Sequence, residues 1–163
     1  MKSNHDREAQ FARLLDEYSG MLGRIAATYG RTAEDQADIL QEVRIQLWRA
    51  LPTLDASRNR KTWAYRVALN SAISWFRKAR RWQPVDFELE TVLVGTGFSP
   101  ETLVLRQLIS ELDPLDRALL SLHLDELSNE EVGDVLGISA SNVAVKLTRL
   151  RQRLRTLANK EEL

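Results

Sequence analysis

The chain has 163 residues, equal numbers of basic and acidic residues, and no cysteine. This length allows one medium-sized domain or two small ones. The absence of cysteine excludes a disulfide framework and a thiolate metal site. The sequence contains no run of about 18 apolar residues, and its charged N-terminus does not resemble a signal peptide. We therefore expect a cytoplasmic protein with no direct membrane insertion, no bound metal and no cofactor.

Charge is distributed unevenly along the chain. Residues 55–83 hold 8 basic residues and 1 acidic residue, and residues 135–160 hold 6 basic residues and no acidic one. The intervening residues 84–134 hold 2 basic and 12 acidic residues. Two basic blocks separated by an acidic one predict two separate anion-facing surfaces rather than one basic tail.

Helical periodicity dominates the first part of the chain. Apolar residues recur at steps of three and four from Phe11 to Tyr29, which predicts one long helix ending near Gly30. A second helix is expected after the acidic stretch 34–38, and Pro52 should end it. Both helices carry enough apolar residues on one face to pack against each other.

A polar, basic loop is expected over residues 53–61, followed by a third helix over about 62–81. Trp63 should lie on the buried face of this helix, as should Trp48 on the preceding one. The two later tryptophans, Trp75 and Trp82, either pack in the protein or stack on bases. Basic residues gather near the end of this helix in greater number than pairing with the helix dipole requires. These features predict a compact bundle with a nucleic-acid-binding surface.

Residues 84–102 interrupt the helical pattern with two prolines and two glycines, which predicts a flexible linker. Helical periodicity then resumes, with Pro114 suited to the first turn of a helix. The sequence therefore predicts an all-α protein made of two small helical domains, residues 6–83 and residues 103–158.

The most informative segment is 128–155. Ser128 and Glu131 form a capping-box pattern before a short helix, and Gly137 suits a left-handed turn. Ser139 can then cap a second helix, so the segment predicts a helix-turn-helix. The second helix begins with polar residues and continues with basic ones, which suits the major groove of DNA. An ordinary helical hairpin with a solvated basic face is the less favoured alternative.

Two segments resemble the extracytoplasmic-function branch of the sigma-70 family of RNA polymerase sigma factors. Residues 112–155 resemble the family's region four. The shared positions are Leu112 to Pro114, Arg117, Leu127 and Ser128, Glu130 to Gly133, and Leu136 and Gly137. Residues 38–51 resemble the region-two signature Asp-x-x-Gln-Glu, and residues 61–81 resemble the Trp-Leu-Tyr-Arg-Ile-Ala-x-Asn helix. The occurrence of both motifs in this order identifies the chain as a member of the family.

The resemblance implies a non-enzymatic initiation factor that binds core RNA polymerase and reads promoter DNA at the −10 and −35 elements. Residues 6–83 correspond to region two, and residues 103–158 to region four. The polymerase partners implied are the β′ clamp helices and the β flap, and control by an anti-sigma factor is expected. No catalytic residue is implied.

The resemblance also implies three sets of site residues. Polymerase binding is expected from Asp38, Gln41 and Glu42. A flipped −10 base should be held by the loop 54–61 with Asn70 behind it. The −10 contacts expected are Asp55, Ser57, Arg58, Asn59, Arg60, Lys61, Arg66, Asn70, Arg77 and Lys78. The −35 contacts expected are Ser139, Ser141, Asn142, Lys146, Arg149 and Arg153.

The sequence departs from the family pattern at four places. Ala144 and Val145 replace positions that are often polar or basic, so they either contact a thymine methyl group or contribute no readout. Arg60 stands where the family usually has Phe, and Ser74 where Asp is common. The bases read by this chain therefore do not follow from the resemblance.

Two other functions fit the sequence less well. A free-standing helix-turn-helix regulator would have no use for a polymerase-docking helix, so the region-two motif disfavours it. A catalytic protein is disfavoured because the sequence contains no Gly-rich phosphate loop, no metal-ligand cluster and no nucleophile–base arrangement.

Overall fold

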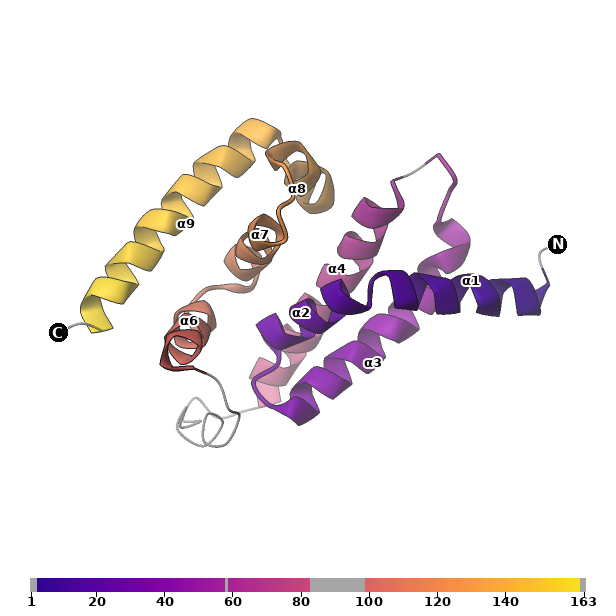
Figure 1. Cartoon of the computed structure of the whole chain (residues 1–163), viewed down its shortest axis with the longest axis horizontal. Coiled ribbons are helices and arrows are strands. Elements are labelled where there is room, and N and C mark those ends of the chain that lie inside the picture. The colour runs from indigo at the N-terminus through magenta and orange to yellow at the C-terminus, as the bar shows by residue number, and fades with distance from the viewer. Residues whose placement is uncertain (1–2, 58, 83–98, 162–163) are drawn as a thin grey trace. The chain divides into compact units, whose positions relative to one another are not determined.

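A computed structural model describes residues 3–57, 59–82 and 99–161. The chain divides into two compact units, Met1–Trp82 and Gln83–Leu163. Within the described residues all regular structure is helical (Figure 1), so the predicted all-α class is confirmed. The predicted flexible linker falls mainly on residues 83–98, which lie outside the described residues.

The first unit is a bundle built around α3. Its elements are α1 (Asn4–Glu17), α2 (Ser19–Tyr29), α3 (Ala33–Ala50), the 3-10 turn η1 (Leu51–Thr53) and α4 (Arg60–Trp82). Helices α2, α3 and α4 pack against one another (Figure 1). Ile39 and Tyr29 are almost completely buried between them, and the Tyr29 ring meets Phe76 edge to face with centroids 5.9 Å apart. Trp63 is also buried, as predicted.

The prediction of one long helix up to Tyr29 is wrong. The chain bends at Tyr18, whose φ of −106° and ψ of 13° separate α1 from α2. Ser19 and Gly20 follow directly, and Ser and Gly pairs are common sites of helix kinks. Hydrogen bonds continue across the bend, from the Leu22 N–H to the Tyr18 carbonyl at 2.9 Å. The apolar spacing continues through the bend. The bend therefore cannot be predicted from that spacing.

Arg7 fastens α1 to the end of α3. Its Nη2 donates to the Trp48 carbonyl at 2.7 Å, and its guanidinium carbon lies 4.1 Å from the centroid of the Trp48 ring. Phe11 contacts the same ring edge-on at 5.2 Å. A cation beside the last carbonyls of a helix is favourably placed. Trp48 is therefore half-buried, covered by α1 rather than enclosed in the central core.

The second unit contains α6 (Pro100–Ser110), α7 (Pro114–Leu124), α8 (Asn129–Leu136) and α9 (Ala140–Glu161). Residues 100–102, which the sequence assigned to the linker, form the first turn of α6. The long helix α9 packs against the other three helices. Leu119, Val132 and Val143 are at most 1% exposed and form the centre of this core.

The predicted helix starts and stops in this unit are confirmed. Pro114 is the first residue of α7, and the Asp113 carboxylate caps that helix by accepting from the Asp116 N–H at 2.9 Å. Ser128 and Glu131 form the capping box of α8. Gly137 ends α8 with a φ of 73°, the left-handed conformation that glycine adopts without strain.

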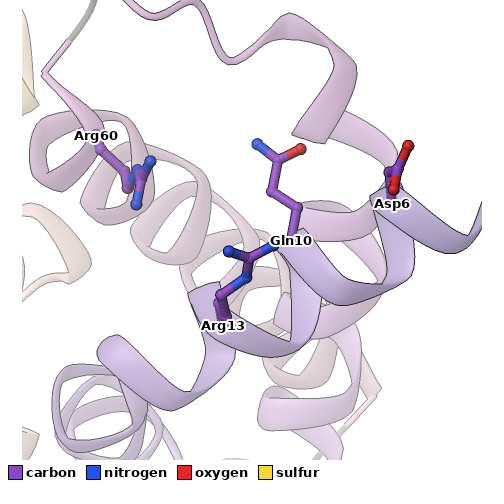
Figure 2. A pocket seen from close by; sticks show the side chains of 4 residues that line it. All are labelled: Asp6, Gln10, Arg13 and Arg60. Carbon is purple, nitrogen blue, oxygen red and sulfur yellow. The ribbon is translucent and has the colours of Figure 1, made fainter. Parts of the chain in front are cut away.

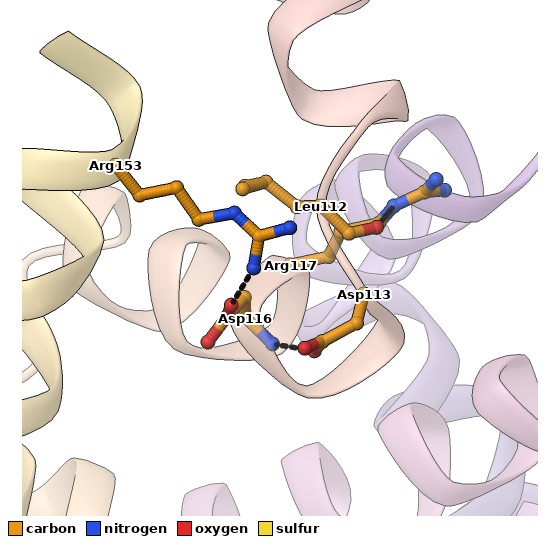
Figure 3. Close-up of polar contacts among 5 residues, drawn as sticks. All are labelled: Leu112, Asp113, Asp116, Arg117 and Arg153. Atoms are coloured by element: carbon orange, nitrogen blue, oxygen red, sulfur yellow. Dashed lines mark hydrogen bonds and ion pairs between the residues drawn. The ribbon is translucent and has the colours of Figure 1, made fainter. Parts of the chain in front are cut away.

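Arg117 is a charged residue buried in the second unit, with 3% of its surface exposed. Its Nε donates to the Leu112 carbonyl at 3.0 Å, and its Nη2 donates to the Ser110 carbonyl at 2.7 Å (Figure 3 shows the first of these bonds). Both carbonyls belong to the end of α6 and the turn that follows it. Arg117 lies on α7 and therefore caps the C-terminus of α6.

Gly133 allows the turn between α8 and α9 to approach the helix closely. A Cβ atom at this position would lie 2.5 Å from the Ile138 carbonyl oxygen, which is a backbone atom. The Gly133 carbonyl accepts from the N–H groups of Gly137 and Ile138, at 2.7 and 3.0 Å. Any side chain at position 133 must therefore displace the turn that orients α9.

We expect Gly133→Ala to lower the free energy of unfolding by about 1–3 kcal/mol, the usual effect of overpacking. Gly23→Ala is the matched control, because nothing lies within 4 Å of a Cβ atom at Gly23 on the exposed face of α2. There alanine should stabilise the helix by about 0.5–1 kcal/mol. Thermal denaturation followed by circular dichroism measures both effects. Equal stability of the two variants would contradict the close approach at Gly133.

Candidate nucleic-acid interface

Helix α9 separates a buried face from an exposed one. Val143, Leu147 and Leu150 are 0–5% exposed and pack into the unit. Ser141, Asn142 and Arg149 are exposed on the other side. With about 100° of rotation per residue, these three side chains span only about 100° of the helix circumference. Together with α8 and the Gly137 turn, α9 forms the predicted helix-turn-helix, whose second helix turns polar and basic groups outward.

Two predicted DNA-contacting cations on α9 lie toward α7. The Arg153 Nη1 is 3.4 Å from the Asp116 Oδ2 (Figure 3). Burial raises the pKa of the Asp116 carboxyl, the nearby Asp113 raises it further, and Arg153 and Lys146 oppose this rise. Lys146 is thus close enough to act on the same carboxylate. These two cations lie along one edge of the outward face, while Arg149 lies nearer its centre.

Ser139 has a structural role at the start of α9. Its Oγ accepts from the Asn142 N–H at 3.1 Å, so Ser139 caps the helix as predicted. Its side chain remains exposed. The outward face therefore begins with a capped helix terminus, which exposes N–H groups favourable to phosphate.

A second exposed stripe runs along α4. Arg66, Asn70 and Arg77 are all exposed and lie within about 40° of one another around the helix. The stripe extends for about 16 Å along the axis. Lys78 is exposed at its edge. Three of the predicted −10 residues on this helix, Arg66, Asn70 and Arg77, are thus brought onto one face.

The loop 54–59 lies at the start of this helix. The Asp55 Oδ1 accepts from the Ser57 N–H at 3.0 Å, and the Asn59 Oδ1 caps α4 by accepting from the Thr62 N–H at 3.2 Å. Asn70 lies ten residues beyond Arg60, about 15 Å of helix rise. The structure therefore separates Asn70 from the loop along the axis of α4. Arg58 lies outside the described residues.

Arg60 faces α1 rather than the stripe. Its Nη1 lies 3.4 Å from the Glu17 Oε2, and both side chains are about half exposed. Burial and the neighbouring Glu17 raise the pKa of Tyr18, while Arg60 opposes them. Arg60 also lines a surface cavity of about 320 Å³ with Asp6, Gln10 and Arg13 of α1 (Figure 2). Its neighbour Lys61 is half-buried.

The predicted polymerase-binding residues share one face of α3. Asp38 and Gln41 are exposed, and the partly covered Glu42 accepts from the Gln46 Nε2 at 2.9 Å. Ile45 lies among them and is 39% exposed. Sequence reasoning missed Ile45, although it lies on the side of α3 away from the buried Ile39, Val43 and Leu47. The sequence does contain a signal for it, because Ile45 does not share the helical spacing of the buried apolar residues of α3.

Comparisons with known proteins identify both units. Residues 14–82 match the family model for Sigma-70 region 2, and residues 102–154 match that for Sigma-70, region 4. The ECF RNA polymerase sigma factor SigM of Bacillus subtilis (strain 168) is 31% identical over 134 residues, which cover 76% of this chain and 79% of SigM. The chain belongs to the extracytoplasmic-function sigma factors. It is thus a factor that directs promoter-specific transcription initiation by RNA polymerase.

Other sigma factors are similar over most of their length. The ECF RNA polymerase sigma factor SigW of the same organism is 28% identical over 167 residues, covering 92% of this sigma factor and 89% of SigW. The fold matches that of RpoE from Bartonella quintana, solved with the anti-sigma factor NepR, with a TM-score of 0.70 and 18% identity over 92% of this chain and 97% of that one. CnrH, solved with the cytosolic domain of CnrY, gives a TM-score of 0.68 and 24% identity over 94% and 90%.

Among the described residues, no helix is long and apolar enough to cross a membrane. In the same ranges, no group of three or more His, Cys, Asp or Glu residues could hold a metal ion.

Proposed function

We propose that the first unit acts as region two and the second as region four of a two-point promoter reader. The α4 surface handles the −10 element, and α9 reads the −35 element from the major groove. The observation that supports this division is the pair of outward faces, Arg66–Asn70–Arg77 on α4 and Ser141–Asn142–Arg149 on α9, each on its own folded unit. The proposed boundaries are 6–83 for region two and 103–158 for region four.

Asp38, Gln41 and Glu42 are proposed to bind the β′ clamp helices of core RNA polymerase, and the second unit to bind the β flap. Ile45 extends the first surface, because an exposed aliphatic side chain between polar groups gains free energy when a partner covers it. Apolar centres with polar rims are typical of protein interfaces. The two surfaces on α3 and α4 then serve different partners, polymerase and DNA.

The loop 54–61 and the α4 stripe are proposed to hold the non-template strand of the −10 element. The ring of Trp75 is half-buried, so the surface binds chiefly through its cations and the Asn70 amide. Because Arg60 is engaged with Glu17, the contribution of Arg60 requires that exposed ion pair to open. Exposed pairs of this kind are worth about 0–1 kcal/mol, so DNA can replace the partner.

The factor is proposed to work in the cytoplasm without a catalytic role of its own. Control by an anti-sigma factor is part of the proposal, supported by the similar fold of RpoE, which was solved with NepR. Such a partner would act by covering the polymerase-binding or DNA-binding faces.

Run-off transcription with purified core RNA polymerase tests the proposed function. A promoter library with randomised −10 and −35 regions should yield specific start sites only when this chain is present. Tight binding of the chain alone to symmetric duplex sites, with no start at any promoter, would instead indicate a free-standing helix-turn-helix regulator.

Asn70→Ala should reduce promoter melting about tenfold, the effect of losing one specific base contact. The fold should persist, because Asn70 is exposed on a helix and alanine has the higher helix propensity. Permanganate reactivity of −10 thymines measures melting. Asn159→Ala, the same change at an exposed position of α9, is the control. Equal melting by both variants would remove Asn70 from the site.

A further inference from the structure

Helix α9 carries an exposed aliphatic side chain in the middle of its outward face. Val145 is 47% exposed, whereas Val143, Leu147 and Leu150 are at most 5% exposed. With about 100° per residue, Val145 lies on the side of the helix opposite these three side chains. Packing within the second unit therefore does not account for an apolar residue at this position.

The neighbours of Val145 are groups that bind DNA. Ser141 lies one turn before it and Arg149 one turn after it, and both are exposed. Asn142 is exposed at the edge of the same face. No acidic residue occurs between positions 135 and 160, so this part of the chain attracts the DNA backbone. Val145 is thus an apolar centre within a polar and basic surface.

The major groove offers a specific partner for such a centre. The base edges in this groove present hydrogen-bond donors and acceptors, and thymine adds a 5-methyl group that binds apolar side chains. Valine is also restricted to one dominant rotamer in a helix, so its two methyl groups are held in a fixed orientation. A polar side chain at this position would favour a donor or acceptor instead.

We propose that Val145 contacts the 5-methyl group of a thymine, on either strand of the −35 element, and makes that base pair a determinant of promoter choice. The inference rests on the proposed reading of −35 DNA by α9 and adds the chemistry of one contact. Ser141 and Arg149 then contact positions on either side of this thymine. The family resemblance left the role of this residue open, and its exposure between Ser141 and Arg149 supports the base contact.

Promoters in which single thymines are replaced by deoxyuridine test the proposal, because the replacement removes only the methyl group. Holoenzyme formed from core RNA polymerase and this chain is used on a promoter recovered from the randomised library. We expect one −35 replacement to weaken promoter binding about fourfold, the factor that corresponds to burying one methyl group. Holoenzyme with Val145→Ala should bind more weakly and lose its sensitivity to that replacement.

Two further variants control for fold and shape. Val104→Ala makes the same change at a residue of α6 that is 46% exposed, and it should keep the full thymine preference. Val145→Thr nearly preserves the shape of the side chain but replaces a methyl group by a hydroxyl, and it should reduce the preference. Circular dichroism should show unchanged folding in each case.

The proposal is overturned if Val145→Ala retains the wild-type sensitivity, or if no −35 replacement affects a holoenzyme that still selects promoters. The second result would leave the proposed sigma function intact. Absence of any specific start from the library would instead contradict the proposed function itself.

Discussion

Replacement of Arg117 by methionine should lower the free energy of unfolding of the second unit by about 2–4 kcal/mol. Methionine keeps an unbranched side chain of similar length but removes the donors to the Leu112 and Ser110 carbonyls. A buried acceptor left without a partner costs about 1–3 kcal/mol. Arg117→Lys should have an intermediate effect, since lysine keeps the charge but lacks the planar fork of donors.

The distribution of tryptophans allows this effect to be assigned to one unit. All four tryptophans, at positions 48, 63, 75 and 82, belong to the first unit. In guanidinium titrations, tryptophan fluorescence therefore reports the first unit, while circular dichroism reports both. Arg117→Met should move a part of the dichroism transition to lower denaturant and leave the fluorescence transition in place. An unchanged dichroism curve would show that the buried guanidinium does not stabilise the unit.

Much of the fold followed from the sequence because local signals agreed with tertiary packing. The Ser128 cap of α8 and the end of α8 at Gly137 were predictable because both are local: the Ser128 side chain accepts from a backbone N–H three residues on, and Gly137 adopts a left-handed conformation. The bend at Tyr18 was not readable, because the apolar pattern continues through it. The engagement of Arg7 with Trp48, 41 residues away, depends on contacts that no local pattern records.

The sequence predicted which kind of site each surface forms, but not the contacts that the individual side chains make. Charge and spacing placed Arg66, Asn70 and Arg77 on a helix, and the structure puts them on one exposed face. The same reasoning could not foresee that Arg60 pairs with Glu17 or that Arg153 pairs with Asp116. These pairs join residues at least 37 positions apart, so they depend on how the helices pack.

The roles of exposed apolar residues were the hardest to predict from the sequence. Ile45 and Val145 are both exposed, and each lies within a proposed binding face. A sequence analysis that assigns apolar residues to the core and polar residues to the surface overlooks Ile45 and leaves Val145 undecided. The close approach at Gly133 was also not predicted, because it depends on the position of the Ile138 carbonyl oxygen in the following turn.

Arg149→Ala should reduce transcription from promoters that depend on a −35 element by about 10- to 100-fold, the equivalent of about 1–3 kcal/mol for a specific base contact. In the part of the chain that the structure describes, no acidic side chain pairs with Arg149, unlike Arg153. Its guanidinium is therefore available for a bidentate contact with a base edge. If Arg149 contacts a base, the variant should also lose preference at one base pair, whereas loss of a phosphate contact would weaken all sequences equally.

Arg151→Ala is the matched control for charge. Arg151 is also exposed on α9, but its Nη2 lies 3.5 Å from His123 of α7, on a different side of the helix from Arg149. Both variants lose one cation, so both lose the same general attraction to DNA. Run-off transcription on promoters with an intact or a scrambled −35 element distinguishes the two variants. Arg149→Ala should match the wild type only on the scrambled promoter, and Arg151→Ala should retain most activity on both. If the two variants behave alike, charge alone governs binding, and α9 does not read bases through Arg149.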